Sequence, residues 1–151
     1  DYADILDKEL FLNNEGEPSS LFDGMPEILT ICEEKKIPWG IITNKPRKFT
    51  EKLLLKLDLV SRCSLLLCAD DVSQPKPHPE SMFIAAKKLN INLNKSVYVG
   101  DHDRDIAAGN AAKMITVAAE YGYIESHSKL TDWCASHIIQ HPSQLKQLFL
   151  A

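Results

Sequence analysis

Apolar positions along the chain change their spacing from segment to segment, and the change predicts the order of the structural elements. Short continuous apolar runs bounded by turn residues are typical of buried strands, whereas three- and four-residue spacing is typical of amphipathic helices. The short runs lie at residues 37–43, 64–68, 97–99, 115–118 and 137–139. Segments with helical spacing or good helix formers separate them, so the pattern predicts strands that alternate with helices.

Five predicted helices follow from these segments. The first covers residues 25–36 with Pro26 in its first turn, and the second is marked by Phe49, Leu53 and Leu57. The third opens at Pro79, and its inward-facing residues are Met82, Phe83, Ala86 and Leu89. The fourth follows Gly100, and the last carries Leu145, Leu148 and Phe149. No hairpin signal joins the strands. We therefore predict βαβ units, an α/β fold and a parallel sheet with helices on both faces.

The N-terminal segment has a different character. Tyr2, Ile5, Leu6 and Leu10 form a helical stripe over residues 1–13, and the following stretch to residue 20 is polar and rich in chain breakers. We therefore expect a helical piece and linker over residues 1–20, followed by the main domain over residues 21–151.

Composition narrows the class of protein. The chain has 151 residues, 44% hydrophobic and 25% charged, with a formal net charge of −4, which is typical of one globular domain and unlike a binder of nucleic acid or anionic membrane. No apolar run approaches the roughly 20 residues of a membrane span. The four cysteines form no disulfide framework. We expect reduced thiols and a cytoplasmic protein.

Candidate chemistry lies at the predicted strand ends, where parallel sheets bind ligands. Thr43 and Asn44 follow one strand and precede a helix, so a hydroxyl and a backbone amide could hold phosphate oxygens there. Taken alone, they could equally be a helix cap. Lys76 lies in a loop stiffened by three alternating prolines, which suits a fixed positive charge, although an isolated surface lysine is a common alternative.

Asp101 and Asp105 follow the strand at residues 97–99 across a glycine. On a helix their spacing puts both carboxylates on one face, where they repel by a few tenths of a kcal/mol. A hard cation such as Mg²⁺, held between the carboxylates and a phosphate, would remove that repulsion. The alternative is that Asp101 caps the helix and the other acids are solvated.

The order of these residues resembles the haloacid dehalogenase superfamily of phosphatases. Its second, third and fourth motifs are a strand-end Thr or Ser, a Lys and G-D-x-x-x-D, matched here by Thr43, Lys76 and the segment from Gly100 to Asp105. The resemblance covers nearly everything from residue 21 onward. It points to the phosphoglycolate phosphatase branch, near members that act on N-acetylmuramic acid 6-phosphate, through residues 39–46 (WGIITNKP), 76–80 (KPHPE), 98–101 (YVGD), 104–109 (RDIAAG) and 119–124 (AEYGYI).

The resemblance implies a Rossmann-like three-layer core and a Mg²⁺-dependent phosphomonoester hydrolase acting through an aspartyl-phosphate. It implies that Asp101 ligates Mg²⁺ and that Asp105 ligates through water or orients the ligands. It also implies that Thr43 and Asn44 bind the phosphoryl oxygens and that Lys76 offsets charge. The implied catalytic residues are thus Lys76, Asp101 and Asp105, and the partner is a small phosphorylated metabolite.

The family's first motif, D-x-D-G-T, is absent from the sequence. The family carries its nucleophile on that motif, after a central strand and before a helical cap. We therefore expect the chain to be the C-terminal portion of a longer phosphatase, with the last cap helix over residues 1–13 and the first core strand missing. A homodimer or an N-terminal segment would then be needed to cover the free strand edges. His102 also stands where near relatives often carry an acid, which would alter the surroundings of the metal.

Other functions fit less well. A response-regulator receiver domain also uses Asp, Thr and Lys with Mg²⁺, but its acidic pair comes first in the chain. A dinucleotide-binding domain requires G-x-G-x-x-G after a strand, which the sequence lacks. A phosphosugar mutase of the same superfamily is a minor alternative. The strongest alternative is a non-catalytic remnant that binds phosphate, Mg²⁺ or a partner chain.

Overall fold

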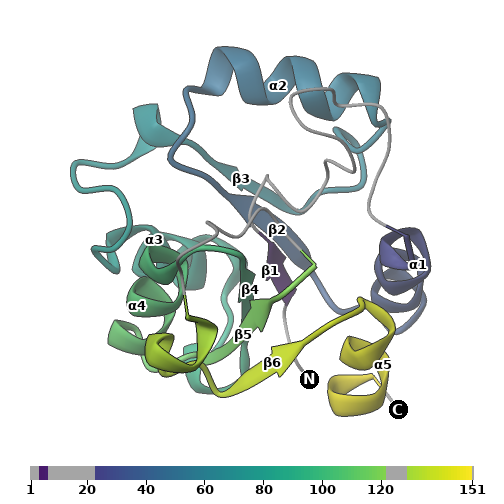
Figure 1. The fold of residues 1–151 in the computed structure, drawn as a ribbon. Coiled ribbons are helices and arrows are strands. Elements are labelled where there is room, and N and C mark those ends of the chain that lie inside the picture. Colours follow the sequence, from purple (N-terminus) through teal and green to yellow (C-terminus); the bar gives the residue numbers. More distant parts are fainter. Residues whose placement is uncertain (1–3, 7–22, 122–128, 151) are drawn as a thin grey trace.

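A single six-stranded sheet organises the chain in a computed structural model that describes residues 4–6, 23–121 and 129–150 (Figure 1). Its spatial order is β3-β2-β1-β4-β5-β6, and every neighbouring pair is parallel. The strands are β1 (Asp4–Leu6), β2 (Trp39–Ile42), β3 (Leu65–Leu67), β4 (Val97–Gly100), β5 (Ile115–Ala119) and β6 (His137–Ile139). The predicted α/β class and parallel sheet are therefore confirmed.

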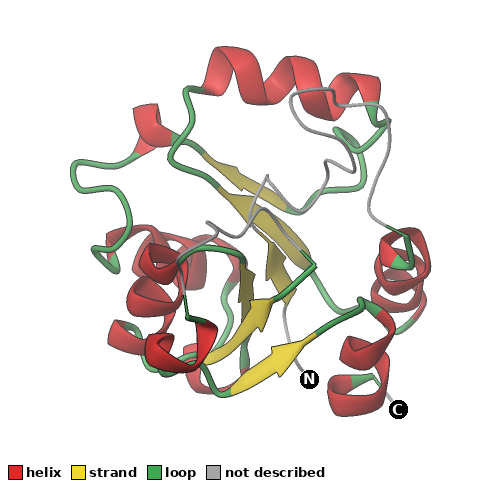
Figure 2. Cartoon of the chain, viewed as in Figure 1, coloured by secondary structure: helices red, strands yellow, loops and turns green. Residues whose placement is uncertain are grey.

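Helices cover both faces of this sheet (Figures 1 and 2). They are α1 (Met25–Glu34), α2 (Arg47–Lys56), α3 (Glu80–Leu89), α4 (Asp103–Ala111) and α5 (Ser143–Phe149), with short 3₁₀ turns η2 (Ala69–Asp71), η3 (Leu93–Lys95) and η4 (Leu130–Trp133). In Figure 1, α1 and α5 lie on one side of the sheet, whereas α3 and α4 lie on the other. Each of the five helices predicted after residue 20 is present, with its limits shifted by a few residues.

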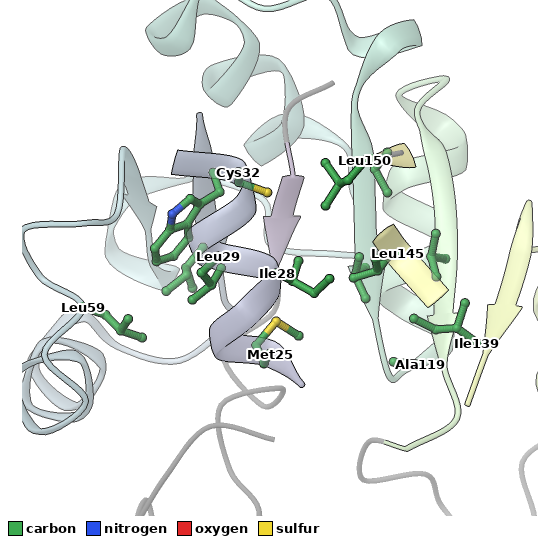
Figure 3. Close-up of a cluster of buried hydrophobic side chains, with 14 of the residues drawn as sticks. Met25, Ile28, Leu29, Cys32, Leu59, Ala119, Ile139, Leu145 and Leu150 are labelled. Atoms are coloured by element: carbon green, nitrogen blue, oxygen red, sulfur yellow. The ribbon is translucent and has the colours of Figure 1, made fainter. Parts of the chain in front are cut away.

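The two faces are set by alternation along each strand. Val97 and Val99 of β4 join an apolar cluster with α1 and α5, whereas Tyr98 between them joins a second cluster with α3 and α4. Figure 3 shows the first cluster, to which α1 contributes Leu29, α5 contributes Leu145 and β6 contributes Ile139. All four residues of β2 and of β4 are buried, as expected for strands covered on both faces.

The position of one predicted core residue is wrong. Phe83 was expected to face inward, but it is 51% exposed, while Ser81, Met82 and Ala85 form the buried side of α3. The four apolar residues of the predicted stripe span an arc of about 120°, and Phe83 lies at one edge of it, about 100° around the axis from Met82. The helix packs on the side where small residues allow close approach to the sheet.

The N-terminal segment also differs from the prediction. Residues 4–6 were expected within a cap helix, and the central position of the sheet was expected to be empty; instead β1 occupies it between β2 and β4. Ile5 and Leu6 are a run of only two apolar residues, which fits a strand as well as a helix. The backbone groups of β2 and β4 would be unpaired without a strand between them, and this favours the strand. The rest of residues 1–20 lies outside the described part of the chain.

Candidate functional site

Thr43 and Asn44 lie where β2 ends. Thr43 is 4% exposed, its backbone N–H donates to Leu67 O at 3.0 Å, and its Oγ1 accepts a hydrogen bond from the Lys45 backbone N–H at 3.1 Å. The Asn44 side chain donates from Nδ2 to Lys76 O at 3.1 Å and accepts from the Lys76 N–H through Oδ1 at 3.2 Å. Asn44 thus clamps the backbone of Lys76 beside Thr43.

Lys76 is buried, with 1% of its side chain exposed. Its Nζ donates to Asp105 Oδ1 at 2.7 Å, to the Tyr98 hydroxyl at 2.7 Å and to Ile42 O at 3.1 Å. These acceptors come from α4, β4 and β2, so one ammonium group joins three elements at the carboxyl edge of the sheet. A solvated surface lysine, the alternative left open by the sequence, is excluded.

Asp105 is fully buried and uses both carboxylate oxygens. Oδ1 pairs with Lys76, and Oδ2 accepts the His102 backbone N–H at 3.2 Å. Gly100 makes this position accessible, because a Cβ there would collide with Cβ of Asp105 and lie 2.8 Å from its Cγ. The G-D-x-x-x-D spacing therefore has a physical reason: the glycine lets the second carboxylate fold back against the strand end.

His102 begins α4 as its N-cap. Its Nδ1 accepts the Arg104 backbone N–H at 3.2 Å and also lies 2.7 Å from Asp103 Oδ1. Through these two contacts the imidazole orients the first turn of the helix. His102 and Asp105 form a capping box: the His102 ring accepts from the Asp105 backbone N–H, and the Asp105 carboxylate accepts from the His102 backbone N–H.

Asp101 directly follows β4 and is 4% exposed. Tyr121, which follows β5, is partly buried; burial, with the nearby Asp101 carboxylate adding to it, raises the pKa of the Tyr121 phenol above its usual range. A neutral Tyr121 hydroxyl can donate a hydrogen bond to an anion across the neutral pH range. Tyr121 thus lies near Asp101, while its side chain also packs against the apolar cluster of α1 and α5.

The structure links most of the predicted site residues. Asn44 holds Lys76, and Lys76 pairs with Asp105, although the three come from separate segments. Thr43 and Asp101 follow β2 and β4, the two neighbours of β1, so their backbones are about two strand spacings, ~10 Å, apart. A phosphoryl group with a bound cation fits that span.

Carboxylate oxygens of Asp101 and Asp105 suit a hard cation, which proteins often hold by one or two carboxylates together with a phosphate. Among the described residues no group of three or more His, Cys, Asp or Glu side chains gathers for a metal. Both carboxylate oxygens of Asp105 have partners in Lys76 and the His102 backbone, and Asp101 lies directly after β4 at the carboxyl edge of the sheet. The donor set is compatible with Mg²⁺ that also binds a phosphate.

Tyr98 contacts Lys76 and Tyr121 lies near Asp101, but neither was predicted as a site residue. The alternation of β4 contained the signal for Tyr98, because it faces the same side of the sheet as α4 while its neighbours face α1. Tyr121 was part of a family-like stretch, yet only its position after β5, at the carboxyl edge of the sheet, indicates that it lies near Asp101.

One surface cavity opens beside the predicted site residues, and a second lies between α1 and α5. One of about 520 Å³ is lined by Pro77, the first turn of α4 and η4, and so opens beside the Lys76 loop. Another of about 720 Å³ lies between α1 and α5 and contains none of the predicted site residues. The location of the chemistry thus rests on the buried side-chain contacts rather than on cavity size.

Comparison with known families gives one match over most of the chain. The model of the haloacid dehalogenase-like hydrolases matches residues 5–119. An N-acetylmuramic acid 6-phosphate phosphatase from Pseudomonas putida is 39% identical over 130 residues, covering 86% of this chain and 58% of that protein. A phosphoglycolate phosphatase from Xanthomonas campestris pv. campestris is 37% identical over 130 residues, covering 86% and 59%. The chain spans a little over half the length of these curated relatives.

Solved structures share the fold. A predicted phosphoglycolate phosphatase from Haemophilus somnus 129pt matches with a TM-score of 0.79 and 22% identity over 85% of this chain and 56% of that one. A β-phosphoglucomutase from Clostridium difficile matches with a TM-score of 0.72 and 23% identity over 87% and 55%. At these identities the likeness concerns the fold alone.

Proposed function

The chain belongs to the haloacid dehalogenase-like hydrolase family, and from this premise we propose that it is part of a Mg²⁺-dependent phosphomonoester hydrolase. The observation that carries the proposal is the buried Lys76–Asp105 pair at the carboxyl edge of the sheet. Desolvation of a charge pair buried in this way can cost more than the pair gains, and we infer that this pair is retained for its geometry. Phosphoryl transfer needs such fixed positive charge and positioning.

Each site residue has a role in this proposal. The Thr43 hydroxyl and the Asn44 backbone amide bind the phosphoryl oxygens, and Lys76 neutralises part of their charge. Asp101 holds the cation, and Asp105 positions Lys76 and the first turn of α4. Bound Mg²⁺ would supply further charge neutralisation at the phosphoryl oxygens.

The nucleophile of the proposed reaction lies outside this chain. Members of the family attack phosphorus with the first Asp of D-x-D-G-T and form an aspartyl-phosphate, and residues 1–151 contain no such motif. Strand β1 occupies the central position, but the sequence that follows it is Asp7-Lys8-Glu9-Leu10-Phe11 and does not match the motif. We expect this chain alone to be inactive, because loss of a covalent nucleophile costs many orders of magnitude.

The substrate in this proposal is a small phosphomonoester. The relatives' names specify phosphoglycolate and N-acetylmuramic acid 6-phosphate, which both carry a carboxylate besides the phosphate. We therefore propose a phosphoglycolate phosphatase-like activity, and small phosphorylated acids are the substrates to test first.

We also propose a cytoplasmic setting. Cys32, Cys63, Cys68 and Cys134 are all free thiols, which suits a reducing compartment. Burial raises the pKa of the Cys63 thiol to about 11, so this group stays a thiol at neutral pH. Among the described residues every helix is too short or too polar to cross a lipid bilayer.

A non-catalytic remnant is the second candidate, and the missing first motif favours it. Such a protein would keep the phosphate and cation contacts without turnover, or would bind a partner chain through the same surface. It differs from the hydrolase in one measurable respect: it binds inorganic phosphate but releases none from an ester.

A phosphate-release screen of the complete protein, with and without Mg²⁺, tests both candidates. We expect Mg²⁺-dependent release from a small phosphorylated acid, and an at least tenfold higher Mg²⁺ requirement in Asp101→Asn. Asp103→Asn is the matched control, because Asp103 is an acid of the same turn with 66% of its side chain exposed. Release that is insensitive to Asp101→Asn at limiting Mg²⁺ would overturn the metal assignment.

A further inference from the structure

All three N–H donors of the Lys76 ammonium group have acceptors within reach in this arrangement. A lysine ammonium carries three N–H donors. Within the described part of the chain, Nζ lies at hydrogen-bond distance from acceptors on Asp105, Tyr98 and Ile42. A phosphoryl oxygen can therefore gain a direct hydrogen bond from Lys76 only when one of these acceptors loses the hydrogen bond that it receives from Nζ.

The three acceptors are not equally replaceable. Asp105 carries the opposite charge at 2.7 Å, so its bond is charge-assisted and the strongest of the three. Ile42 O is a backbone carbonyl at the end of β2 and is the most distant acceptor, at 3.1 Å. Leaving that carbonyl without a donor in a buried site would be unfavourable.

Tyr98 offers Ile42 a second donor. Its hydroxyl accepts from Lys76 Nζ at 2.7 Å and also lies in position to donate to Ile42 O at 3.3 Å. The ammonium, the hydroxyl and the carbonyl form a closed triangle, and Nζ also lies 5.4 Å from the centre of the Tyr98 ring. The ring is fully buried and fixed within β4, so its hydroxyl is held at a defined point.

We propose that Tyr98 is a positioning residue for Lys76: it anchors the ammonium at the strand ends and takes over the Ile42 carbonyl when Lys76 turns a proton toward a phosphoryl oxygen. The inference rests on the proposed phosphate site. It extends that function by one residue, whose hydroxyl touches Lys76 but not the substrate.

The test removes that hydroxyl alone. Tyr98→Phe is compared with Thr116→Val, which removes another buried hydroxyl, one that contacts Asn110 and Ser136 instead. Two readouts are measured in each variant: the ¹H–¹⁵N signal of the Lys76 ammonium, assigned by its loss in Lys76→Met, and the affinity for inorganic phosphate. In Tyr98→Phe we expect at least tenfold faster exchange of the ammonium protons and about tenfold weaker phosphate binding, with neither change in Thr116→Val.

Unchanged ammonium exchange and unchanged phosphate affinity in Tyr98→Phe would overturn the inference, as would equal losses in Thr116→Val. The unmodified protein supplies a readout that does not depend on the folding of a variant: added phosphate should shift the Lys76 ¹⁵Nζ and Tyr98 ¹³Cζ resonances together. A shift of Lys76 without Tyr98 would contradict the exchange of partners. Absence of any phosphate binding would instead refute the proposed phosphate site, while the ammonium signal still decides whether Tyr98 anchors Lys76.

Discussion

The two faces of the sheet are held in different ways. The face under α1 and α5 packs apolar side chains, among them Leu29, Val99 and Leu145, against one another. On the opposite face, toward α3 and α4, the packing also surrounds buried polar groups, including Lys76 and Asp105. Both faces belong to the same strands, so their contrast reflects side-chain chemistry rather than backbone geometry.

The contrast between the two faces distinguishes side chains that fill space from side chains that hold a charged group in place. Apolar contacts have no preferred direction, and many combinations of side chains of similar volume fill such a face. A buried ammonium requires acceptors at fixed distances, which restricts the types of residue that can stand at each acceptor position. We therefore expect substitutions on the α1 face to change stability alone, and substitutions on the α4 face to change stability and ligand binding together.

The largest expected effect comes from breaking the buried pair. Asp105→Leu leaves the Lys76 ammonium without its counter-charge and should lower the free energy of unfolding by about 3–5 kcal/mol. The double variant Lys76→Met/Asp105→Leu removes both charges and should recover most of that loss, since apolar replacements of buried pairs are often neutral. Urea denaturation measures all three proteins.

The double variant shows whether the charge pair serves stability or ligand binding. Recovery of stability without recovery of phosphate binding would show that the pair is kept for its geometry. A single-variant loss below about 1 kcal/mol, or a double variant no more stable than the single one, would remove the energetic difference between the two faces.

A cavity on the α1 face should give the next largest effect. Leu29 is fully buried in the cluster of Figure 3, and Leu29→Ala should lower the free energy of unfolding by about 3 kcal/mol. Because the cavity lies on the other side of the sheet from Lys76, phosphate affinity should stay within twofold of the unsubstituted protein where both are folded. A tenfold loss of phosphate affinity would show that the two faces are coupled.

Sequence patterns predicted the two faces unequally. In the described part of the chain, hydrophobic spacing located the five α-helices and five of the strands, because burial of a periodic apolar stripe is a local property. It could not place β1, since Ile5 and Leu6 become a strand only through the free edges of β2 and β4, which lie far away in the sequence. Phe83 was assigned inward for a related reason: periodicity does not specify which side of a helix the sheet approaches.

The candidate site was predicted as types of residue rather than as contacts. Thr43, Lys76 and Asp105 stand out because a hydroxyl, a cation and a carboxylate at strand ends are rarely needed for packing. Tyr98 did not, because an aromatic residue within a strand is expected in a core. Its hydroxyl gains a function from Ile42 and Lys76, which come from other segments, so only the fold reveals it.

The smallest expected effect lies at the edge of the α1 face, where Glu33 accepts hydrogen bonds from Arg62 Nε at 2.9 Å and Trp39 Nε1 at 3.1 Å. The bond from Arg62 is the largest influence on the pKa of the Glu33 carboxyl, which lies below its usual value although partial burial opposes the shift. A lowered pKa in the folded state stabilises the protein above the unfolded-state pKa of about 4.3. That contribution is lost as the pH falls through the folded-state value.

Because 36% of the Glu33 side chain is exposed, the contribution should stay below about 1 kcal/mol. Urea denaturation of the unsubstituted protein and of Glu33→Gln should therefore show a small stability difference at pH 7 that shrinks toward pH 3. The α4 face should respond differently, since its polar groups are shielded from solvent: added salt should weaken the Glu33 contribution and leave the cost of Asp105→Leu nearly unchanged. Equal salt sensitivity at both positions would show that the Lys76 pair is open to water, and the contrast between the two faces would then be wrong.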